Sequence, residues 1–270
     1  MPDLSVIIIN YNQFQMTIDC INSILEKTHD IRVEIILVDN HSDKINPDDF
    51  LKIFPTQIKL IKSQENGGFA KGNNLGIQQA SGEYIVLLNN DTLLQNNAFL
   101  STKLFLESQQ DVAIATGKLI YPNGQIQHNC QRFPSVKYKL AELFRIQKLV
   151  GKKRAGTLLF GSFFDHNTIA YPDWVWGTYF MFRKSFLTEF EEHKLPETFF
   201  MYCEDMEWCM ETKKKGYKIG FEPKGEVIHL LGASGAKKNQ LMEENLDKFK
   251  KMYYSSFSRF IVKTIDRLLS

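Results

Sequence analysis

Two short polar segments of this chain contain side chains that could carry out chemistry. Asn89, Asn90 and Asp91 directly follow a continuous apolar run, residues 84–88. A carboxylate at the end of a buried strand can reach a divalent cation, and Mg²⁺ or Mn²⁺ prefers oxygen ligands and leaves sites for water and phosphate. Because such a cation neutralises charge on a departing diphosphate, Asp91 is a candidate metal ligand. The alternative is an ordinary turn, where Asn-Asp pairs are common.

The second segment is the acidic pair Glu204 and Asp205, which opens a predicted helix over residues 204–215 that ends in lysines before Gly216. A helix N-terminus favours an ionised carboxylate, so Asp205 is a candidate general base. Simple capping by acidic residues is the alternative. His229 closes a short apolar run and is a third candidate, although a lone histidine is more often structural.

A glycine-rich segment, residues 67–76, precedes or opens a predicted helix over residues 69–80. It is not a phosphate-binding P-loop, because Asn73 and Asn74 stand where Lys and Ser or Thr should follow the glycine, and it does not match G-x-G-x-x-G. Its glycines still permit close approach of the backbone to a ligand.

The elements that must position these residues follow from the apolar pattern. Apolar runs at residues 6–9, 35–38, 58–61 and 84–88 are typical of parallel strands covered on both faces, and amphipathic stretches separate several of them. This pattern predicts an α/β fold with a mostly parallel, Rossmann-like central sheet flanked by helices. In the second half we expect strands at 112–116, 118–130, 177–182, 217–221 and 227–230. Residues 132–170 show no clear period and are interpreted as a mobile or acceptor-facing segment.

Three of the predicted strands end in polar residues, namely Asn10 with Asn12, Asp39 with Asn40, and the segment 89–91. In open α/β sheets, ligands bind beyond the carboxyl ends of the strands. We therefore expect these clusters to converge on one pocket, although strand ends also run into polar loops for purely structural reasons.

Bulk properties restrict the class of protein. The chain has 270 residues, 43% hydrophobic and 24% charged residues, and a net charge of +2, which excludes nucleic acid as the expected main partner. Its four cysteines lack disulfide or zinc spacing and are expected to be free thiols. The chain shows neither a basic leader with a cleavable apolar segment nor an apolar run near the ~20 residues that span a bilayer. We expect a cytoplasmic protein, or one at the cytoplasmic face of a membrane.

The C-terminal tail, residues 246–269, reads as one basic amphipathic helix with six basic and two acidic residues. Such a helix can lie in a membrane interface. Packing on the domain or on a second subunit, as in a homodimer, is an equal alternative. Its apolar stripe consists of Phe249, Met252, Tyr253, Phe257, Phe260, Ile261 and Ile265.

Taken in order, the motifs of this chain resemble those of the family 2 glycosyltransferases with the GT-A fold, in particular the rhamnosyltransferase-like branch. The resemblance rests on seven segments spanning residues 4 to about 235: residues 6–12, 38–42, 65–74, 88–92, 176–178, 204–205 and 227–229. It implies a GT-A domain over residues 1–240, with a nucleotide-binding half of about 1–117 and an acceptor half of about 118–240. A helical tail then covers residues 241–270.

The resemblance also implies a role for each matching position. Asp205 is similar to the family's catalytic base, Asp91 and His229 to its metal ligands, and Trp176, Gly177 and Glu204 to its acceptor site. The donor-binding positions that it implies are Asn10, Asn12, Asp39, Asn66, Gly67, Gly68, Lys71, Asn74, Asn89 and Asn90.

Three positions depart from the family pattern. Asn89 replaces the first acid of the D-x-D metal motif, Asn90 stands where this branch often has proline, and Trp176 stands where a small residue is common. One protein carboxylate therefore remains for the cation, which makes metal binding dependent on the donor diphosphate.

The hypothesis is an inverting glycosyltransferase dependent on Mg²⁺ or Mn²⁺. It would use a nucleotide-sugar donor, dTDP-rhamnose first and UDP-sugars second, and a hydroxyl of a growing, lipid-linked or cell-surface glycan as acceptor. Two alternatives stay open: a sugar-nucleotide pyrophosphorylase, although the expected glycine- and basic-rich loop is missing from residues 5–12, and a non-catalytic carbohydrate-binding or scaffold protein.

Overall fold

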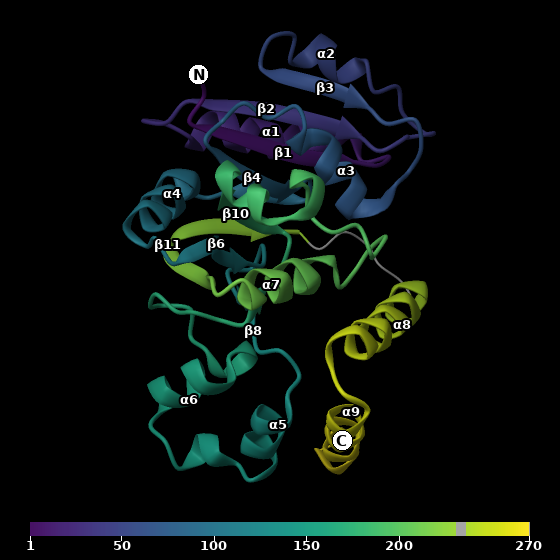
Figure 1. Ribbon diagram of the computed structural model, residues 1–270. Coiled ribbons are helices and arrows are strands. Elements are labelled where there is room, and N and C mark those ends of the chain that lie inside the picture. The colour runs from purple at the N-terminus through teal and green to yellow at the C-terminus, as the bar shows by residue number, and fades with distance from the viewer. Residues whose placement is uncertain (231–235, 270) are drawn as a thin grey trace.

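The computed structural model describes residues 1–230 and 236–269 of the chain (Figure 1). In the first half, strands and helices alternate in the order β1 (Leu4–Asn10), α1 (Phe14–Lys27), β2 (Val33–Asp39), α2 (Asp49–Ile53), β3 (Ile58–Lys62), α3 (Gly68–Ile77), β4 (Tyr84–Asn89), β5 (Thr92–Leu94) and α4 (Ala98–Ser108).

The second half begins with β6 (Val112–Ile120), β7 (Ile126–Gln127), β8 (Cys130–Gln131), α5 (Val136–Leu143), η1 (Ile146–Lys148), α6 (Lys152–Leu159) and η2 (Gly161–Phe163). It continues with β9 (Trp174–Val175), β10 (Tyr179–Arg183), η3 (Lys184–Glu189), η4 (Glu191–His193), α7 (Glu204–Lys214), β11 (Lys218–His229), α8 (Ala236–Tyr253) and α9 (Ser256–Leu269).

The first four strands form the parallel half of the central sheet. Their order is β3-β2-β1-β4, so β1 lies between β2 and β4. In this register Asn10 is opposite Asp39 on one side, and Ile9 is opposite Asn89 on the other. The carboxyl ends of the three strands are therefore level, as the apolar runs and right-handed crossovers predict.

The other half of the sheet is mixed. β10 runs antiparallel between β4 and β6, β11 is parallel to β6, and β5 pairs antiparallel with β11. The two strands predicted over 217–221 and 227–230 form the single strand β11, which has register shifts on either side of its 219–221 pairing with β6. The sheet is thus parallel over β1 to β4, while β10 and β5 are antiparallel additions.

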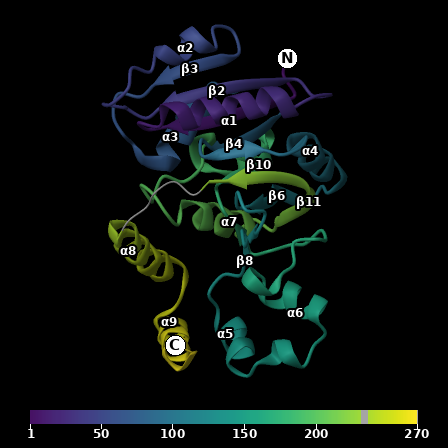
Figure 2. The ribbon, with the colours of Figure 1, turned by 180° about the vertical axis from the view of Figure 1, so that it is seen from behind.

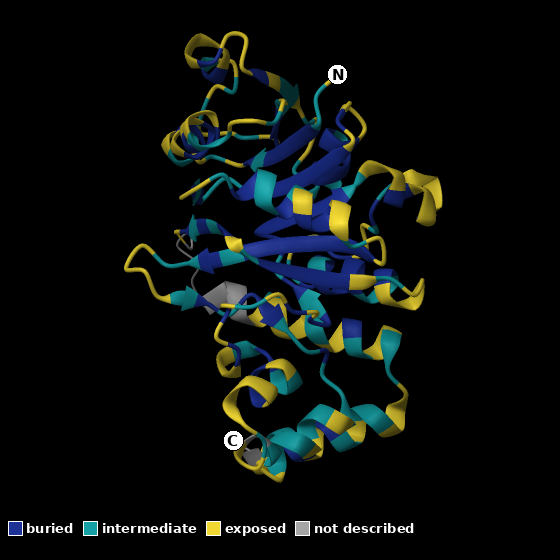
Figure 3. Ribbon diagram, turned by 90° about the vertical axis from the view of Figure 1, so that its left-hand side faces the viewer, coloured by how far each residue is buried: buried dark blue, intermediate teal, exposed yellow. Residues whose placement is uncertain are grey.

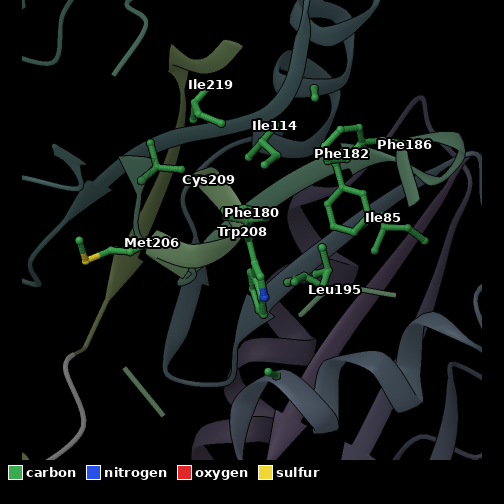
Figure 4. Packing of buried hydrophobic residues seen from close by; sticks show 14 of the residues in the cluster. Ile85, Ile114, Phe180, Phe182, Phe186, Leu195, Met206, Trp208, Cys209 and Ile219 are labelled. Atoms are coloured by element: carbon green, nitrogen blue, oxygen red, sulfur yellow. The ribbon is translucent and has the colours of Figure 1, made fainter. Parts of the chain in front are cut away.

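Helices cover both faces of the sheet. Residues of α1, α2 and α4 pack on one face, and residues of α3, α7 and α8 pack on the other. The strands between them are buried almost throughout (Figure 3). In Figure 4, Trp208 of α7 lies between Phe180 of β10 and Leu195, and its indole nitrogen donates to the carbonyl of Pro196 at 2.9 Å. This packing holds the N-terminus of α7 against the sheet.

Residues 132–170, which show no clear period in the sequence, form several helical elements in the structure. They contain α5, η1, α6 and η2, which lie below the sheet in Figures 1 and 2. Ser135 starts α5 by accepting a hydrogen bond from the backbone N–H of Tyr138. The missing hydrophobic period has a physical cause, because α5 buries none of its residues and α6 buries only two.

The tail is two helices rather than one, so the single-helix prediction was wrong. Ser255 accepts a hydrogen bond from the N–H of Ser258 at 3.2 Å and thereby caps the new helix α9. Phe249 of α8 is fully buried in the core of the main domain, whereas Met252 is exposed. The predicted boundary at residues 240 and 241 lies inside α8, and that at 117 and 118 lies inside β6. Ser270 lies outside the described residues.

The four cysteines are free and buried. Among the described helices, none is both long enough and apolar enough to cross a bilayer.

Candidate active site

The level strand ends are joined by a chain of side-chain hydrogen bonds. Asn10 at the end of β1 donates to Asp39 at the end of β2 at 2.7 Å. Thr17 of α1 donates to Asn10 Oδ1 at 3.0 Å and accepts from Asn90, which follows β4, at 2.9 Å. The three polar clusters therefore meet at one edge of the sheet, where α/β proteins bind ligands.

Asn10 and Asp39 are interior members of this network. Asp39 is only 2% exposed, and its oxygens accept from Asn10, from the Ser42 hydroxyl at 2.6 Å and from the Ser42 N–H at 2.9 Å. Asn10 is fully buried, and both atoms of its amide are also engaged. In this structure both residues hold the adjoining loops in position through these hydrogen bonds, and their role as donor contacts stays a prediction.

Asn12 connects the two loops that follow β1 and β2. Its Oδ1 accepts from the backbone N–H groups of Asp43 at 3.0 Å and Lys44 at 2.8 Å, and its Nδ2 donates to Asp43 Oδ1 at 2.7 Å. The residue has a left-handed backbone, with φ 59°. Asn12 therefore shapes the rim of the site and stays partly exposed there.

Asn40, which belongs to the polar cluster after β2 but was given no separate role from the sequence, anchors the glycine-rich segment. Its Nδ2 donates to Asn66 Oδ1 at 2.9 Å and to the carbonyl of Gly68 at 3.1 Å, and its Oδ1 accepts from the N–H of Gly67 at 3.3 Å. Gly68 has φ +80°, and a Cβ there would lie 2.1 Å from the carbonyl oxygen of Phe200. The segment from Asn66 to Gly68 thus joins the end of β2 to the loop before α7.

The other two predicted side chains of this segment, Lys71 and Asn74, differ in burial and in hydrogen-bond partners. Lys71 is partly exposed and forms an ion pair with Glu65. Asn74 is buried, and it donates to the carbonyl of Leu195 and to Glu197 and accepts from the N–H of Leu195, at 2.8–3.1 Å. Its polar atoms hold residues 195–197 against α3, and its role as a donor contact stays a prediction.

Asp91 and His229 lie side by side, with 3.4 Å between Asp91 Oδ1 and His229 Nε2. Gln127, which the sequence analysis did not single out, orients the imidazole. Its amide nitrogen donates to the carbonyl of His229 at 2.7 Å, so its Oε1 must accept from His229 Nδ1, also at 2.7 Å. A neutral His229 therefore carries its lone pair on Nε2, directed toward Asp91, as in metal-binding histidines.

Asn89 and Asn90 complete this edge. The amide of Asn90 is bound to Thr17 as described, while Asn89 Oδ1 is buried and accepts no hydrogen bond from the described residues. A buried acceptor of this kind suits a hydroxyl donor or a cation brought by a ligand. The described residues include no cluster of three or more His, Cys, Asp or Glu that could hold a metal ion. Protein groups thus offer an incomplete ligand set at Asp91 and His229.

The candidate base is tied to the same strand edge by two consecutive residues. The N–H of Gly177 donates to Asp205 Oδ2 at 3.0 Å, and the carbonyl of Thr178 accepts from the N–H of Asn89 at 3.0 Å. A Cβ on Gly177 would lie 3.3 Å from Phe69 and 3.4 Å from the Cβ of Asp205. The small residue therefore lets the Asp205 carboxylate sit close to the end of β4.

Burial shifts the proton affinity of the acids at the start of α7. It raises the pKa of Asp205 to about 6, against the lowering effect of hydrogen bonds from the N–H groups of Gly177 and Met206. Glu204 is buried more deeply, and desolvation together with the charge of Asp205 raises its pKa well above the usual range. Both carboxyl groups therefore hold their protons more strongly than an exposed carboxyl group does.

Comparison with known proteins places this site in a family. The family described as "Glycosyl transferase family 2" matches residues 5–205. The chain belongs to glycosyltransferase family 2. The match starts in β1 and ends at the candidate base, so it includes the ends of β1, β2 and β4, while His229 lies beyond it.

Relatives and solved structures agree with this membership. This family 2 chain is 30% identical to the glycosyltransferase GlyG of Streptococcus pneumoniae over 96 residues, which are 35% of the chain and 32% of that relative. Its fold is similar to that of GalNAc-T7 solved with UDP, GalNAc and Mn²⁺, with a TM-score of 0.64, 15% identity, and coverage of 92% of this chain and 50% of that one. A mannosyltransferase from Pyrobaculum calidifontis, solved with GDP-Man and Mn²⁺, gives a TM-score of 0.59 at 16% identity, covering 90% and 61%. These two structures share the GT-A fold, and the chain spans about a third of GlyG and between half and two thirds of both solved proteins.

Proposed function

We propose that this protein is an inverting glycosyltransferase that transfers a sugar from a nucleoside diphosphate donor to a hydroxyl group of a glycan. One observation carries the proposal: the Gly177–Thr178 segment binds the Asp205 carboxylate and the end of β4, next to the Asp91 and His229 pair. A base and an incomplete cation site thus share one edge of the sheet. This is the arrangement that a transfer between two bound substrates requires.

The transfer step uses Asp205 as the base. Its carboxylate accepts the proton of the acceptor hydroxyl as the hydroxyl oxygen forms a bond to the anomeric carbon. On the opposite face, the bond from that carbon to the diphosphate oxygen breaks, and the electron pair leaves with the nucleoside diphosphate. The N–H of Gly177, which donates to Oδ2, orients the carboxylate for this role.

Asp91 and His229 are the residues that would hold a divalent cation, Mg²⁺ or Mn²⁺, together with the donor phosphates. The donor set fits, because a carboxylate oxygen and an imidazole nitrogen with a fixed lone pair both ligate Mn²⁺. When bound, the cation supplies charge neutralisation for the leaving diphosphate. Gln127 keeps His229 in the required tautomer.

We assign the donor from the sequence motifs and the similar folds, and the acceptor side from residues next to Asp205. The rhamnosyltransferase-like motifs favour dTDP-rhamnose, and UDP-sugars come second because the similar GalNAc-T7 was solved with UDP. Asn12, Asn66, Lys71 and Asn89 are the partly accessible residues at which we place the donor. Trp176, Gly177 and Glu204 border the acceptor side next to Asp205.

The test is incubation of the protein with a panel of nucleotide sugars in Mg²⁺ or Mn²⁺, with release of the nucleoside diphosphate as the readout. We expect slow hydrolysis of one donor, stopped by EDTA. Formation of a nucleotide sugar and pyrophosphate from a nucleoside triphosphate and a sugar 1-phosphate would instead identify a pyrophosphorylase. Binding of glycan without release of nucleotide from any donor would identify a binding or scaffold protein.

A further inference from the structure

The charges of this chain are strongly segregated. Residues 132–159 and 256–269 together hold eleven basic and two acidic residues. The whole chain holds 33 basic and 31 acidic residues, so the remaining residues hold 22 basic and 29 acidic ones. A net charge of +2 thus conceals one basic region and an acidic remainder. Below, residues 132–159 and 256–269 are called the basic face.

The two parts of the basic face lie together, although more than 90 residues separate them in the sequence. α5 and α9 pack against each other, and Lys139 of α5 forms an ion pair with Asp266 of α9 at 2.8 Å. Val262 and Ile265 are the buried residues of α9. In Figures 1 and 2 both helices lie at the lower end of the molecule, away from β3 and α2 at the other end.

The basic face also exposes large apolar side chains. On α9, Phe257, Phe260 and Leu268 are 73%, 69% and 68% exposed. Their spacing of three and eight residues places them on one side of the helix, between the buried Ile265 and the exposed Lys263 and Arg267. Most of the surface of these three apolar side chains is therefore in contact with solvent.

The segment next to α9 also exposes apolar side chains. Phe144 and Leu149, at the end of α5 and after η1, are 67% and 80% exposed. Exposed basic residues surround them, namely Lys137, Arg145, Lys148, Lys152, Lys153 and Arg154. Lys137 and Arg154 also border a cavity of about 370 Å³ with Tyr138 and Leu158. The arrangement is an apolar patch with a cationic rim.

We infer that the basic face lies on an anionic lipid bilayer, with Phe144, Leu149, Phe257, Phe260 and Leu268 in the acyl boundary and the lysines and arginines at the phosphates. This geometry is that of an interfacial amphipathic surface. A second copy of the chain is a poorer partner, because a two-fold contact would bring two strongly positive surfaces together. Nucleic acid would satisfy the charge but not the exposed leucine and phenylalanine side chains. The inference does not depend on the transfer reaction, and it would bring a lipid-linked acceptor to the protein.

The test is flotation of the full chain with phosphatidylcholine vesicles that contain or lack 30–40% phosphatidylglycerol. We expect binding to the anionic vesicles that weakens with added salt. Each basic residue near such a surface changes the binding constant about fivefold, so Lys152→Gln, Lys153→Gln and Arg154→Gln together should weaken binding by about a hundredfold. Phe257→Ser, Phe260→Ser and Leu268→Ser together should abolish binding, and the melting temperature should stay unchanged because these side chains are exposed.

Matched controls come from the opposite end of the molecule. Lys52→Gln, Lys59→Gln and Lys62→Gln remove three exposed basic residues of α2 and β3, and Leu25→Ser with Leu104→Ser removes exposed apolar residues of α1 and α4. These variants should bind vesicles as the unmodified chain does. Equal binding by all variants, or no binding by the full chain, would overturn the inference. A dimer in sedimentation that the α9 variant dissociates, without vesicle binding, would assign the face to a second copy, and binding to duplex DNA without vesicle binding would assign it to nucleic acid.

Discussion

Replacing Asp205 with asparagine tests the proposed base directly. The substitution retains the size of the side chain and an oxygen that can accept from the N–H of Gly177, but it removes the ability to take up a proton. Removal of a positioned general base slows catalysis by about 10²–10⁴-fold. Asp205→Asn should therefore lose at least a hundredfold in kcat, while the affinity for the donor with Mn²⁺, measured by calorimetry, should stay unchanged.

The pH dependence of kcat/KM for the unmodified enzyme gives a more quantitative prediction. With a pKa of about 6, Asp205 is about 90% ionised at pH 7 and about 10% ionised at pH 5, so kcat/KM should fall about tenfold between these values. A carboxyl with the ordinary pKa of 3.8 would lose only about 6% over the same range. Glutamine has the shape of a protonated glutamate, and Glu204→Gln leaves Asp205 in place. This variant should therefore show the same fall in kcat/KM between pH 7 and pH 5.

The raised pKa of Asp205 also sets the direction in which the stability of the fold changes with pH. Folding raises the pKa of Asp205 from 3.8 to about 6, so the folded state binds more protons in this window and stability falls as pH rises through it. A shift of about two units corresponds to about 3 kcal/mol. Asp205→Asn avoids this cost, and it should raise the free energy of unfolding by up to about 3 kcal/mol at pH 7 and by little at pH 3.5.

Two measurements would refute this reasoning. The first is a kcat/KM profile, from release of nucleoside diphosphate, that stays flat between pH 7 and pH 5. The second is urea unfolding in which Asp205→Asn is no more stable than the unmodified chain at pH 7. Turnover by Asp205→Asn within tenfold of the unmodified enzyme would exclude Asp205 as the base, even if the pH profile and the unfolding experiment agreed with the predictions above.

Three further substitutions test other parts of the site. Gln127→Leu removes the acceptor that fixes the His229 tautomer, so the Mn²⁺ concentration for half-maximal activity should rise about 10–100-fold; an unchanged Mn²⁺ titration would exclude the proposed orientation. Gly68→Ala should lower the free energy of unfolding by more than Gly216→Ala does, because both glycines have positive φ but only Gly68 faces the carbonyl of Phe200. The left-handed backbone alone costs an alanine about 1–2 kcal/mol at either position. Equal losses of stability for the two variants in urea unfolding would contradict the predicted clash with Phe200. Asn74→Leu should destabilise the fold by about 1–3 kcal/mol, because the backbone groups of Leu195 lose their hydrogen-bond partner. At a temperature where the variant is folded, its KM for the donor should change little. A selective rise in KM would instead show that Asn74 contacts the donor.

The N-terminal half of the fold could be predicted from the sequence because its signals are local. Runs such as residues 84–88 are apolar throughout, which is the pattern of a strand buried on both faces, and Gly216 and the lysines before it end α7 where predicted. Residues 132–170 gave no such signal, because helices α5 and α6 expose most of their residues and therefore lack a strong apolar period. The break between α8 and α9 depends on a single capping serine, Ser255.

The sequence by itself determined which residue types are available for chemistry: one carboxylate in the turn after β4, an acidic pair at a helix start, and asparagines at three strand ends. Only the tertiary structure decided how these side chains are used. It buries Asn10, Asp39 and Asn74 in hydrogen bonds within the protein, and it joins the Asp205 carboxylate to the end of β4 through Gly177 and Thr178. It also brings Gln127 to His229 across 102 positions of the chain. The physical reason is that hydrogen-bond partners and desolvation depend on which strands become neighbours, and residue spacing along the chain does not contain that information.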